Sequence, residues 1–156
     1  ESIVRNIRWK PKKFEFDNMF SYGEDNVIDF TKMHNVVGLF ANNAAGKSSV
    51  LSALSFCIFD KCDRAFKASH ILNTQKVTFR CKFNFEVNGV DFFIERKGHA
   101  DKKGNVKVDV KFWKEEGGKV VELNGEARRS TNDIIRDYVG TYDDFILTVF
   151  LAPWNA

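Results

Sequence analysis

The chain has 156 residues and a formal net charge of +3 at pH 7. This length suits one domain with its own core, and 16 phenylalanines supply apolar side chains for it. The charge is too small to identify a nucleic-acid-binding protein by itself. No apolar run approaches the roughly 18 residues of a membrane-spanning helix, and the first ten residues do not resemble a secretion signal. We therefore expect a cytoplasmic protein that contacts no membrane.

The cysteines and histidines follow no metal-binding pattern. Cys57, Cys62 and Cys81 are an odd number without paired spacing, so they are expected to be reduced residues that pack in the core. The histidines have no cysteine or histidine partner at ligand spacing. They are His34, His70 and His99.

Two strands and a turn are predicted in the first 30 residues. Apolar residues alternate with polar ones over residues 3–9, and Phe14 and Phe16 repeat the same two-residue period. Residues 26–30 (NVIDF) indicate a second strand. Residues 19–23 (MFSYG) between them predict a turn.

The most informative segment is the one from residue 36 to residue 60. Residues 36–40 (VVGLF) are an apolar run of strand length, and residues 41–49 (ANNAAGKSS) follow as a loop. Residues 48–60 (SSVLSALSFCIFD) then predict a short helix that is buried on most sides. A strand, a loop containing Gly-Lys-Ser and a helix, in this order, are typical of a P-loop that binds a nucleoside triphosphate.

Each residue type in a P-loop has a physical role. Backbone N–H groups point at the phosphates, Lys47 would reach the β- and γ-phosphates, and the Ser48 hydroxyl would bind Mg²⁺. The helix N-terminus would stabilise the phosphate charge. The residues predicted to bind ATP are Asn42, Asn43, Ala44, Ala45, Gly46, Lys47, Ser48 and Ser49.

Two alanines depart from the glycine-rich P-loop pattern. Ala41 stands where the pattern begins with glycine, and Ala44 adds a further Cβ. If either position needs a positive φ, its Cβ costs about 1–2 kcal/mol, which is a tenfold loss of affinity or a little more. An ordinary strand, turn and helix without a nucleotide is therefore the alternative interpretation.

The middle of the chain predicts an antiparallel meander. Apolar and polar residues alternate on both sides of Asn88-Gly89, which indicates a two-residue hairpin over residues 77–96. This turn sets Phe85 opposite Phe92, Phe83 opposite Ile94 and Lys82 opposite Glu95. Further strands are predicted at residues 106–112 and 119–123, joined by a turn at Gly117-Gly118.

The last 30 residues predict a helix and a strand. Residues 130–133 (STND) supply an N-cap and early negative charge for a helix of about ten residues that stops at Gly140. Residues 142–144 (YDD) predict a turn. The continuous apolar run over residues 145–151 predicts a strand that is covered on both faces.

These motifs resemble the ATP-binding-cassette heads of the SMC and SbcC-type ATPases of double-strand-break repair. Residues 18–23 (NMFSYG) are similar to the family's N-F-x-S loop, residues 42–49 to its G-x-N-G-S-G-K-S-S loop, and residues 71–73 (ILN) to the linker after its first helix. Within the family the chain looks most similar to the large subunit of the recombination nuclease of tailed phages.

The resemblance implies a fold and a set of partners. The fold would be α/β with α+β character: the N-terminal lobe of an ABC/SMC-type P-loop NTPase head, with a mixed sheet and an antiparallel β meander. Residues 1–156 would be a single partial domain, with Ser21 near the nucleotide. The implied partners are the C-terminal lobe of the same head, a second head in a homodimer, an SbcD-type nuclease subunit and DNA.

The implied activity needs more than this chain. Closure of two heads on ATP and Mg²⁺ would regulate DNA binding and the nuclease, in a bacterium or a phage-infected host cell. No catalytic residue is predicted here, because the acidic strand that polarises the attacking water belongs to the other lobe. The competing class is a module with a degenerate P-loop that binds protein or DNA without hydrolysing ATP.

Two further groups of residues are left open. Basic residues could follow DNA phosphates along the meander, although solvated basic faces are commoner. These residues are Lys10, Lys12, Lys13, Lys102, Lys103, Lys107, Arg128 and Arg129. Phenylalanines at strand period are expected in the core, whereas Trp9 and Trp113 remain candidates for base stacking.

Overall fold

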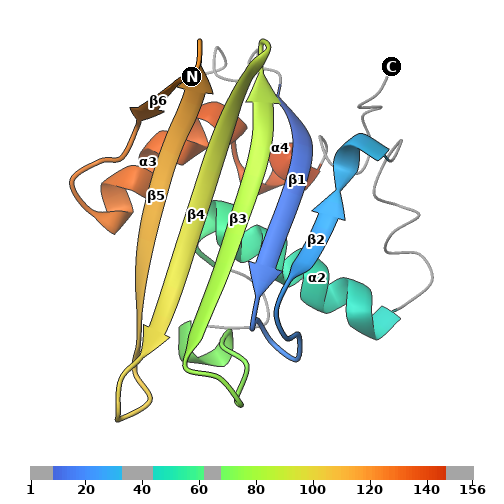
Figure 1. The fold of residues 1–156 in the computed structure, drawn as a ribbon, viewed down its shortest axis with the longest axis vertical. Helices are drawn as coiled ribbons and strands as arrows, with labels where there is room; N and C mark the ends of the chain where they lie inside the picture. The colour runs from blue at the N-terminus through green and yellow to red at the C-terminus, as the bar shows by residue number, and fades with distance from the viewer. Residues whose placement is uncertain (1–8, 33–43, 62–67, 147–156) are drawn as a thin grey trace.

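A six-stranded antiparallel sheet with helices on one face forms the part of the chain that the structure describes (Figure 1). The structure is a computed structural model that describes residues 9–32, 44–61 and 68–146, with the backbone alone for residues 44–48 and 146. The strand order is β2-β1-β3-β4-β5-β6. The strands are β1 (Trp9–Asp17), β2 (Asn26–Asp29), β3 (Thr78–Val87), β4 (Val90–Ala100), β5 (Val106–Glu116) and β6 (Lys119–Glu122).

The helices lie behind the sheet in the view of Figure 1. The helix α2 crosses behind the sheet, with its first turn beyond the edge strand β2 and its last turn behind β4, while α3 lies behind β5. The helical segments are η2 (Phe30–Lys32), α2 (Ala44–Phe59), η3 (Ala68–His70), α3 (Arg128–Val139) and α4 (Tyr142–Ile146).

The predicted meander is confirmed, including its register. Phe85 pairs with Phe92 and Lys82 with Glu95, because Asn88 and Gly89 take positive φ values of 52° and 81° and close a two-residue turn. The same alternation extends β4 beyond the prediction to Ala100. The predicted turn before β6 is also present, with both of its glycines at positive φ.

One face of the sheet forms the core with α2. Alternate residues of β1, β3 and β4 point to this face, and phenylalanines dominate it, as their number in the sequence predicted. On α2, residues 52–59 are all buried, which confirms a helix covered on most sides. Trp9 belongs to this core: it is 7% exposed, donates its indole N–H to the carbonyl of Val139 and stacks on Phe145. It is therefore no platform for base stacking.

Two helices begin earlier than predicted. α2 begins at Ala44, inside the segment expected to be loop, because alanine is the strongest helix former and two alanines stand there. α3 begins at Arg128 with Ala127 as its N-cap, so Ser130 is the third helical residue and not the cap. The Ser130 hydroxyl accepts a hydrogen bond from the Ala127 N–H, which supports the earlier start. Gly140 ends α3 as predicted.

The predicted turn and strand after Gly140 are wrong where the structure describes them. Residues Tyr142–Ile146 form the helix α4. Thr141 and Asp144 cap it reciprocally: Asp144 Oδ2 accepts from the Thr141 N–H at 3.0 Å, and Thr141 Oγ1 accepts from the Asp144 N–H at 3.2 Å. This local cap overrides the apolar run that indicated a strand. Residues 147–151 lie outside the described part, as do the strands predicted at residues 3–8 and 36–40.

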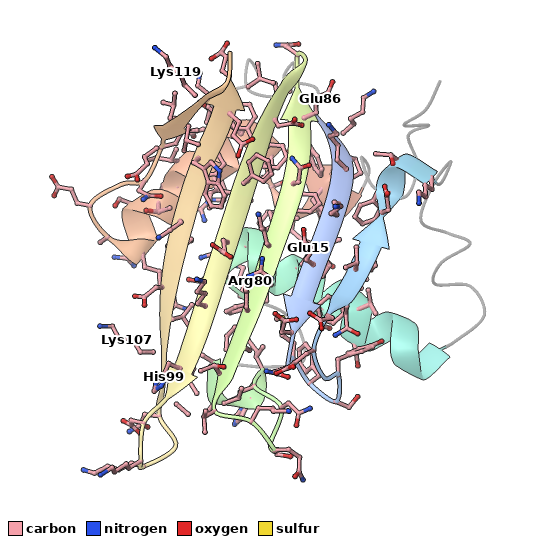
Figure 2. The ribbon with its side chains drawn as sticks, in the orientation of Figure 1. Glu15, Arg80, Glu86, His99, Lys107 and Lys119 are labelled. Atoms are coloured by element: carbon pink, nitrogen blue, oxygen red, sulfur yellow. The ribbon has the colours of Figure 1, made fainter. Side chains whose placement is uncertain are left out.

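The other face of the sheet carries polar and charged side chains (Figure 2). Arg80 lies at its centre and meets three carboxylates, those of Glu15, Asp17 and Glu95, with the closest contact 2.8 Å from Glu95. Within the described residues, no helix is long and apolar enough to cross a membrane.

Candidate functional site

The N-terminal end of α2 carries the predicted phosphate-binding residues. Ala44, Ala45, Gly46, Lys47, Ser48 and Ser49 occupy its first six positions, whereas Asn42 and Asn43 lie outside the described residues. Four backbone N–H groups at a helix start have no partner within the helix, and the helix dipole adds positive charge there. No acidic residue stands anywhere in α2. The helix end therefore fits an anion such as a triphosphate.

The position of Ala44 removes one doubt about the loop. A positive φ was the condition under which its Cβ would weaken binding, but Ala44 is the first residue of a right-handed helix, where alanine is favoured. Ala41 lies outside the described residues. The backbone at residue 44 is therefore helical, and it does not require the glycine that P-loops usually have.

Two short segments that resembled family motifs contact one another. Met19 and Leu72 form an isolated antiparallel bridge, and the Phe20 N–H donates to the carbonyl of Ile71 at 2.6 Å. Asn73 completes the contact, because its N–H donates to the carbonyl of Asn18 at 2.9 Å. Residues 18–23 and 71–73 are thereby held together in the fold although about 50 residues separate them in the sequence.

The 18–23 loop has a strained backbone. Phe20 has a φ of 55°, in a region that residues other than glycine and asparagine rarely adopt, whereas Asn18, with a φ of 61°, is a residue type that tolerates it. Such strain persists only where surrounding contacts hold it, and it gathers at functional sites. Ser21, the predicted nucleotide neighbour in this loop, is exposed.

A buried arginine that the sequence analysis missed holds the C-terminal end of α2. Arg96 on β4 is 0% exposed, and its Nε donates to the carbonyl of Cys57 at 2.7 Å. Its Nη2 donates to the carbonyl of Ile58 at 3.2 Å. These carbonyls belong to the last turn, where an α-helix leaves acceptors without intrahelical partners and where positive charge is favourable. Burial lowers the pKa of Arg96, and the charge of Asp60 opposes this.

Asp60 extends this contact to α3. It follows α2 with a φ of 64°, the left-handed conformation common just after a helix. Its carboxylate lies 3.9 Å from Arg96 Nη1 and accepts two hydrogen bonds from Arg128, at 2.6 Å and 2.5 Å. Asn132 donates a further bond at 2.9 Å. We name Arg96, Asp60, Arg128 and Asn132 the α2 anchor.

A signal for the anchor was present in the sequence. In the predicted hairpin, residues Phe92, Ile94 and Arg96 share one face by their spacing, and the first two are apolar. A charged residue on a buried face is almost always paired, so the position of Arg96 predicts that a polar or acidic group contacts it in the core. No pattern in the sequence identifies Asp60 or Arg128 as that partner.

The basic residues considered for DNA binding do not form one surface. Lys107, like His99 beside it on the sheet, lies at the lower end in Figure 2, whereas Glu86, the strand partner of Lys10, lies at the upper end. Arg128 and Arg129 are on α3, which the sheet separates from this face. Lys12 is paired with Asp91 at 2.9 Å.

Trp113 faces outward but its ring is not open. It stacks on Phe93 with ring centroids 5.3 Å apart, and Lys82 Nζ lies 5.7 Å from its centroid. The same ammonium lies 5.3 Å from the Phe93 ring. The Phe93 and Lys82 contacts occupy part of the ring surface that a stacked base would need.

The burial of two cysteines agrees with the expectation that they pack in the core. Cys57 and Cys81 are buried free thiols, and His70 and His99 are exposed. Among these residues no group of three or more histidine, cysteine, aspartate or glutamate side chains could hold a metal ion. Cys62 and His34 lie outside the described part.

Comparisons with known proteins agree with the resemblance found in the sequence. A family described as AAA domain matches residues 13–151. An uncharacterized protein of Acanthamoeba polyphaga mimivirus is 38% identical over 155 residues, which are 94% of this chain and 11% of that protein. A DNA double-strand break repair Rad50 ATPase of Sulfolobus acidocaldarius is 30% identical over 93% of this chain and 14% of its own length. The SbcC component of the nuclease SbcCD of Bacillus subtilis is 28% identical over 91% of this chain and 13% of its own length.

The chain therefore spans between 11% and 14% of the length of these relatives. A solved structure of the recombination mediator protein RecF-ATP in the RecFOR pathway matches 82% of this chain and 31% of that one, with a TM-score of 0.52 and 18% identity. A likeness at this identity supports the fold. Together with the match to the AAA domain family, it confirms the expected P-loop NTPase fold class. The expected similarity to SbcC-type heads is also confirmed, while the narrower likeness to tailed phages stays a prediction.

Proposed function

Because the chain belongs to the AAA domain family, which matches residues 13–151, we propose that it binds ATP with Mg²⁺ at the N-terminal end of α2. One observation carries the proposal: α2 begins at Ala44, so Gly46, Lys47 and Ser48 lie at its start, where free N–H groups and the positive end of the helix dipole meet the predicted phosphate site. Lys47 would contact the β- and γ-phosphates. Ser48 would hold the Mg²⁺, which neutralises phosphate charge when bound.

The wider function that we propose is that of an SbcC-like ATPase head in DNA repair. The Rad50 and SbcC relatives support it, since they align with nearly all of this chain. In this proposal the chain supplies one lobe of a head, and a second lobe, a second head, an SbcD-type nuclease and DNA are its partners. ATP-driven closure of the heads would regulate the nuclease in the cytoplasm.

The contact between residues 18–23 and 71–73 supports a role for the first loop. Its strained backbone at Phe20 is held by hydrogen bonds between this loop and the second segment. We propose that Ser21, which this loop exposes, lies near the bound nucleotide in the assembled head.

Titration of the chain with a fluorescent ATP analogue and Mg²⁺ tests the proposal. Lys47→Ala should weaken binding by at least about tenfold, which corresponds to about 1.4 kcal/mol. Lys119→Ala is the matched control, because Lys119 is an exposed lysine on the edge strand β6. Equal affinity of both variants, or no saturable binding by the parent chain, would contradict the proposal. The second outcome would favour the degenerate P-loop that binds protein or DNA alone.

A further inference from the structure

We propose that Arg96 is a positioning residue for the nucleotide site, and that it acts by fixing the C-terminal end of α2. The inference rests on the proposed function, because the phosphate-binding residues lie at the other end of the same helix. Arg96 touches neither the loop nor the first turn of α2 in its described hydrogen bonds, which reach only Cys57 and Ile58.

Directional contacts add to the apolar packing that holds α2 against the sheet. Most of its buried surface is aliphatic or aromatic, and hydrophobic burial is non-directional. Hydrogen bonds are directional, and those from Arg96 to Cys57 and Ile58 join α2 to β4. A third contact lies beside them, where Cys57 Sγ is 3.7 Å from the carbonyl of Ile94. The C-terminal end of α2 is thus fixed against one strand by three polar contacts.

A rigid helix carries this constraint to its other end. α2 has 16 residues, and a slip by one residue along its axis would move every turn by about 1.5 Å. Phosphate-binding N–H groups need donor–acceptor distances within a few tenths of an ångström of about 2.9 Å. A misplacement of about 1 Å at a reacting site can cost about a hundredfold in rate. Loss of the C-terminal contacts should therefore weaken phosphate binding at the N-terminal end.

The chemistry of the anchor favours geometry over stability as its role. Taking a guanidinium out of water is costly, and buried ion pairs are often no more stabilising than apolar residues of the same size. Arg96 is fully buried, and its Nη1 has no hydrogen-bond partner within the described part of the chain. Unlike an apolar residue, arginine has several N–H donors in a fixed planar arrangement. It can therefore donate to two successive carbonyls at once.

The test compares three variants of the full chain. Arg96→Met keeps an unbranched side chain and much of the volume but removes the donors, and Arg96→Lys keeps the charge but loses the fork. Val108→Ala removes buried volume from β5, is 6% exposed, and serves as the control for a general loss of stability. Each variant is titrated with the fluorescent ATP analogue and Mg²⁺. Amide hydrogen exchange of residues 49–52 is measured without nucleotide, and unfolding free energies are measured alongside.

Arg96→Met should weaken nucleotide binding at least tenfold, Arg96→Lys should fall between it and the parent, and Val108→Ala should bind as the parent does. Val108→Ala shows how much faster residues 49–52 exchange for a given loss of unfolding free energy. In Arg96→Met, exchange at these residues should accelerate more than its own loss of unfolding free energy accounts for on that scale. If exchange follows stability alone in both variants, the inference is overturned whether or not the chain binds ATP. Absence of binding by the parent chain overturns the proposed function, and the exchange arm still decides the role of Arg96.

Discussion

Asp60 joins α2 to α3 through a two-point contact with Arg128. The guanidinium donates to both carboxylate oxygens, at 2.6 Å and 2.5 Å, across 68 residues of sequence. The two side chains are unequal in exposure: that of Asp60 is 12% exposed, and that of Arg128 is 42% exposed. Behind Asp60 lies the fully buried Arg96. Asp60 is therefore the counter-charge of one buried and one exposed arginine.

Because Arg96 is buried and Arg128 is exposed, mutations of Asp60 and Arg128 should lower the free energy of unfolding by different amounts. Asp60→Asn should lower the free energy of unfolding by about 2 kcal/mol, because it leaves the buried Arg96 without a counter-charge. Arg128→Ala should cost less than about 1 kcal/mol, since exposed ion pairs contribute little. Asparagine tolerates the positive φ of residue 60, so the backbone is not the cause of the loss. Chemical denaturation of both variants measures the difference. Equal costs would show that the pairing with Arg96 is unimportant.

A second prediction concerns the close approach of β4 to Phe79. A Cβ at Gly98 would lie 2.1 Å from Phe79 Cε2, and Phe79 is itself buried and packs edge-on against Phe56 of α2. Gly98→Ala should therefore cost about 1–3 kcal/mol through overpacking. Gly23→Ala is the control, because a Cβ there meets nothing within 4 Å and its φ is not positive. A thermal melt that is unchanged by Gly98→Ala would mean that Phe79 moves aside at no cost.

The meander was predictable because its signals are local. Alternation of apolar and polar residues and the Asn88-Gly89 turn lie within about 20 consecutive residues, and together they fix register as well as strand type. The burial of Phe83 and Phe85 followed from the same alternation. Tertiary contacts reinforce this pattern without changing it.

The α2 anchor was not predictable because its contacts are long-range. Arg96 and Cys57 are 39 residues apart, and Arg128 and Asp60 are 68 apart. The two-residue alternation along β4 places Arg96 on the buried face. Which carbonyls it contacts depends on how α2 packs across β4. The signal for α4 is local instead: Thr141 and Asp144 form its cap, but the continuous apolar run that follows is also typical of a strand.

A third prediction separates the two interpretations of Ala44. If a positive φ were needed there, Ala44→Gly would raise nucleotide affinity by about tenfold. Because Ala44 begins α2, we expect no gain in affinity and a lower free energy of unfolding, by up to about 1 kcal/mol, from the poor helix propensity of glycine. Titration with the fluorescent ATP analogue and denaturation of the same variant measure both quantities. A tenfold tighter complex would contradict the helical start at residue 44.

A fourth prediction follows from the burial of Cys57. Burial raises the pKa of this thiol well above its ordinary value of 9.0, and its neighbour Cys81 raises it further. Above about pH 9 the unfolded chain releases the Cys57 proton, whereas the folded chain still holds it. The contribution of this thiol to stability is therefore complete below about pH 9 and is lost as the pH rises above that value. At pH 10 the parent should therefore be less stable than at pH 7 through this residue, by on the order of 1 kcal/mol.

The variant Cys57→Ala isolates this contribution. It removes the titrating group, so its free energy of unfolding should fall less between pH 7 and pH 10 than that of the parent, although its packing at pH 7 is poorer. The difference in pH dependence, and not the absolute stability, is the measured quantity, because both proteins share all titratable groups except Cys57, and of these Cys81 interacts with it directly. Parallel pH profiles would mean that the Cys57 thiol ionises in the folded chain as readily as in water, which its place between α2 and β4 should prevent.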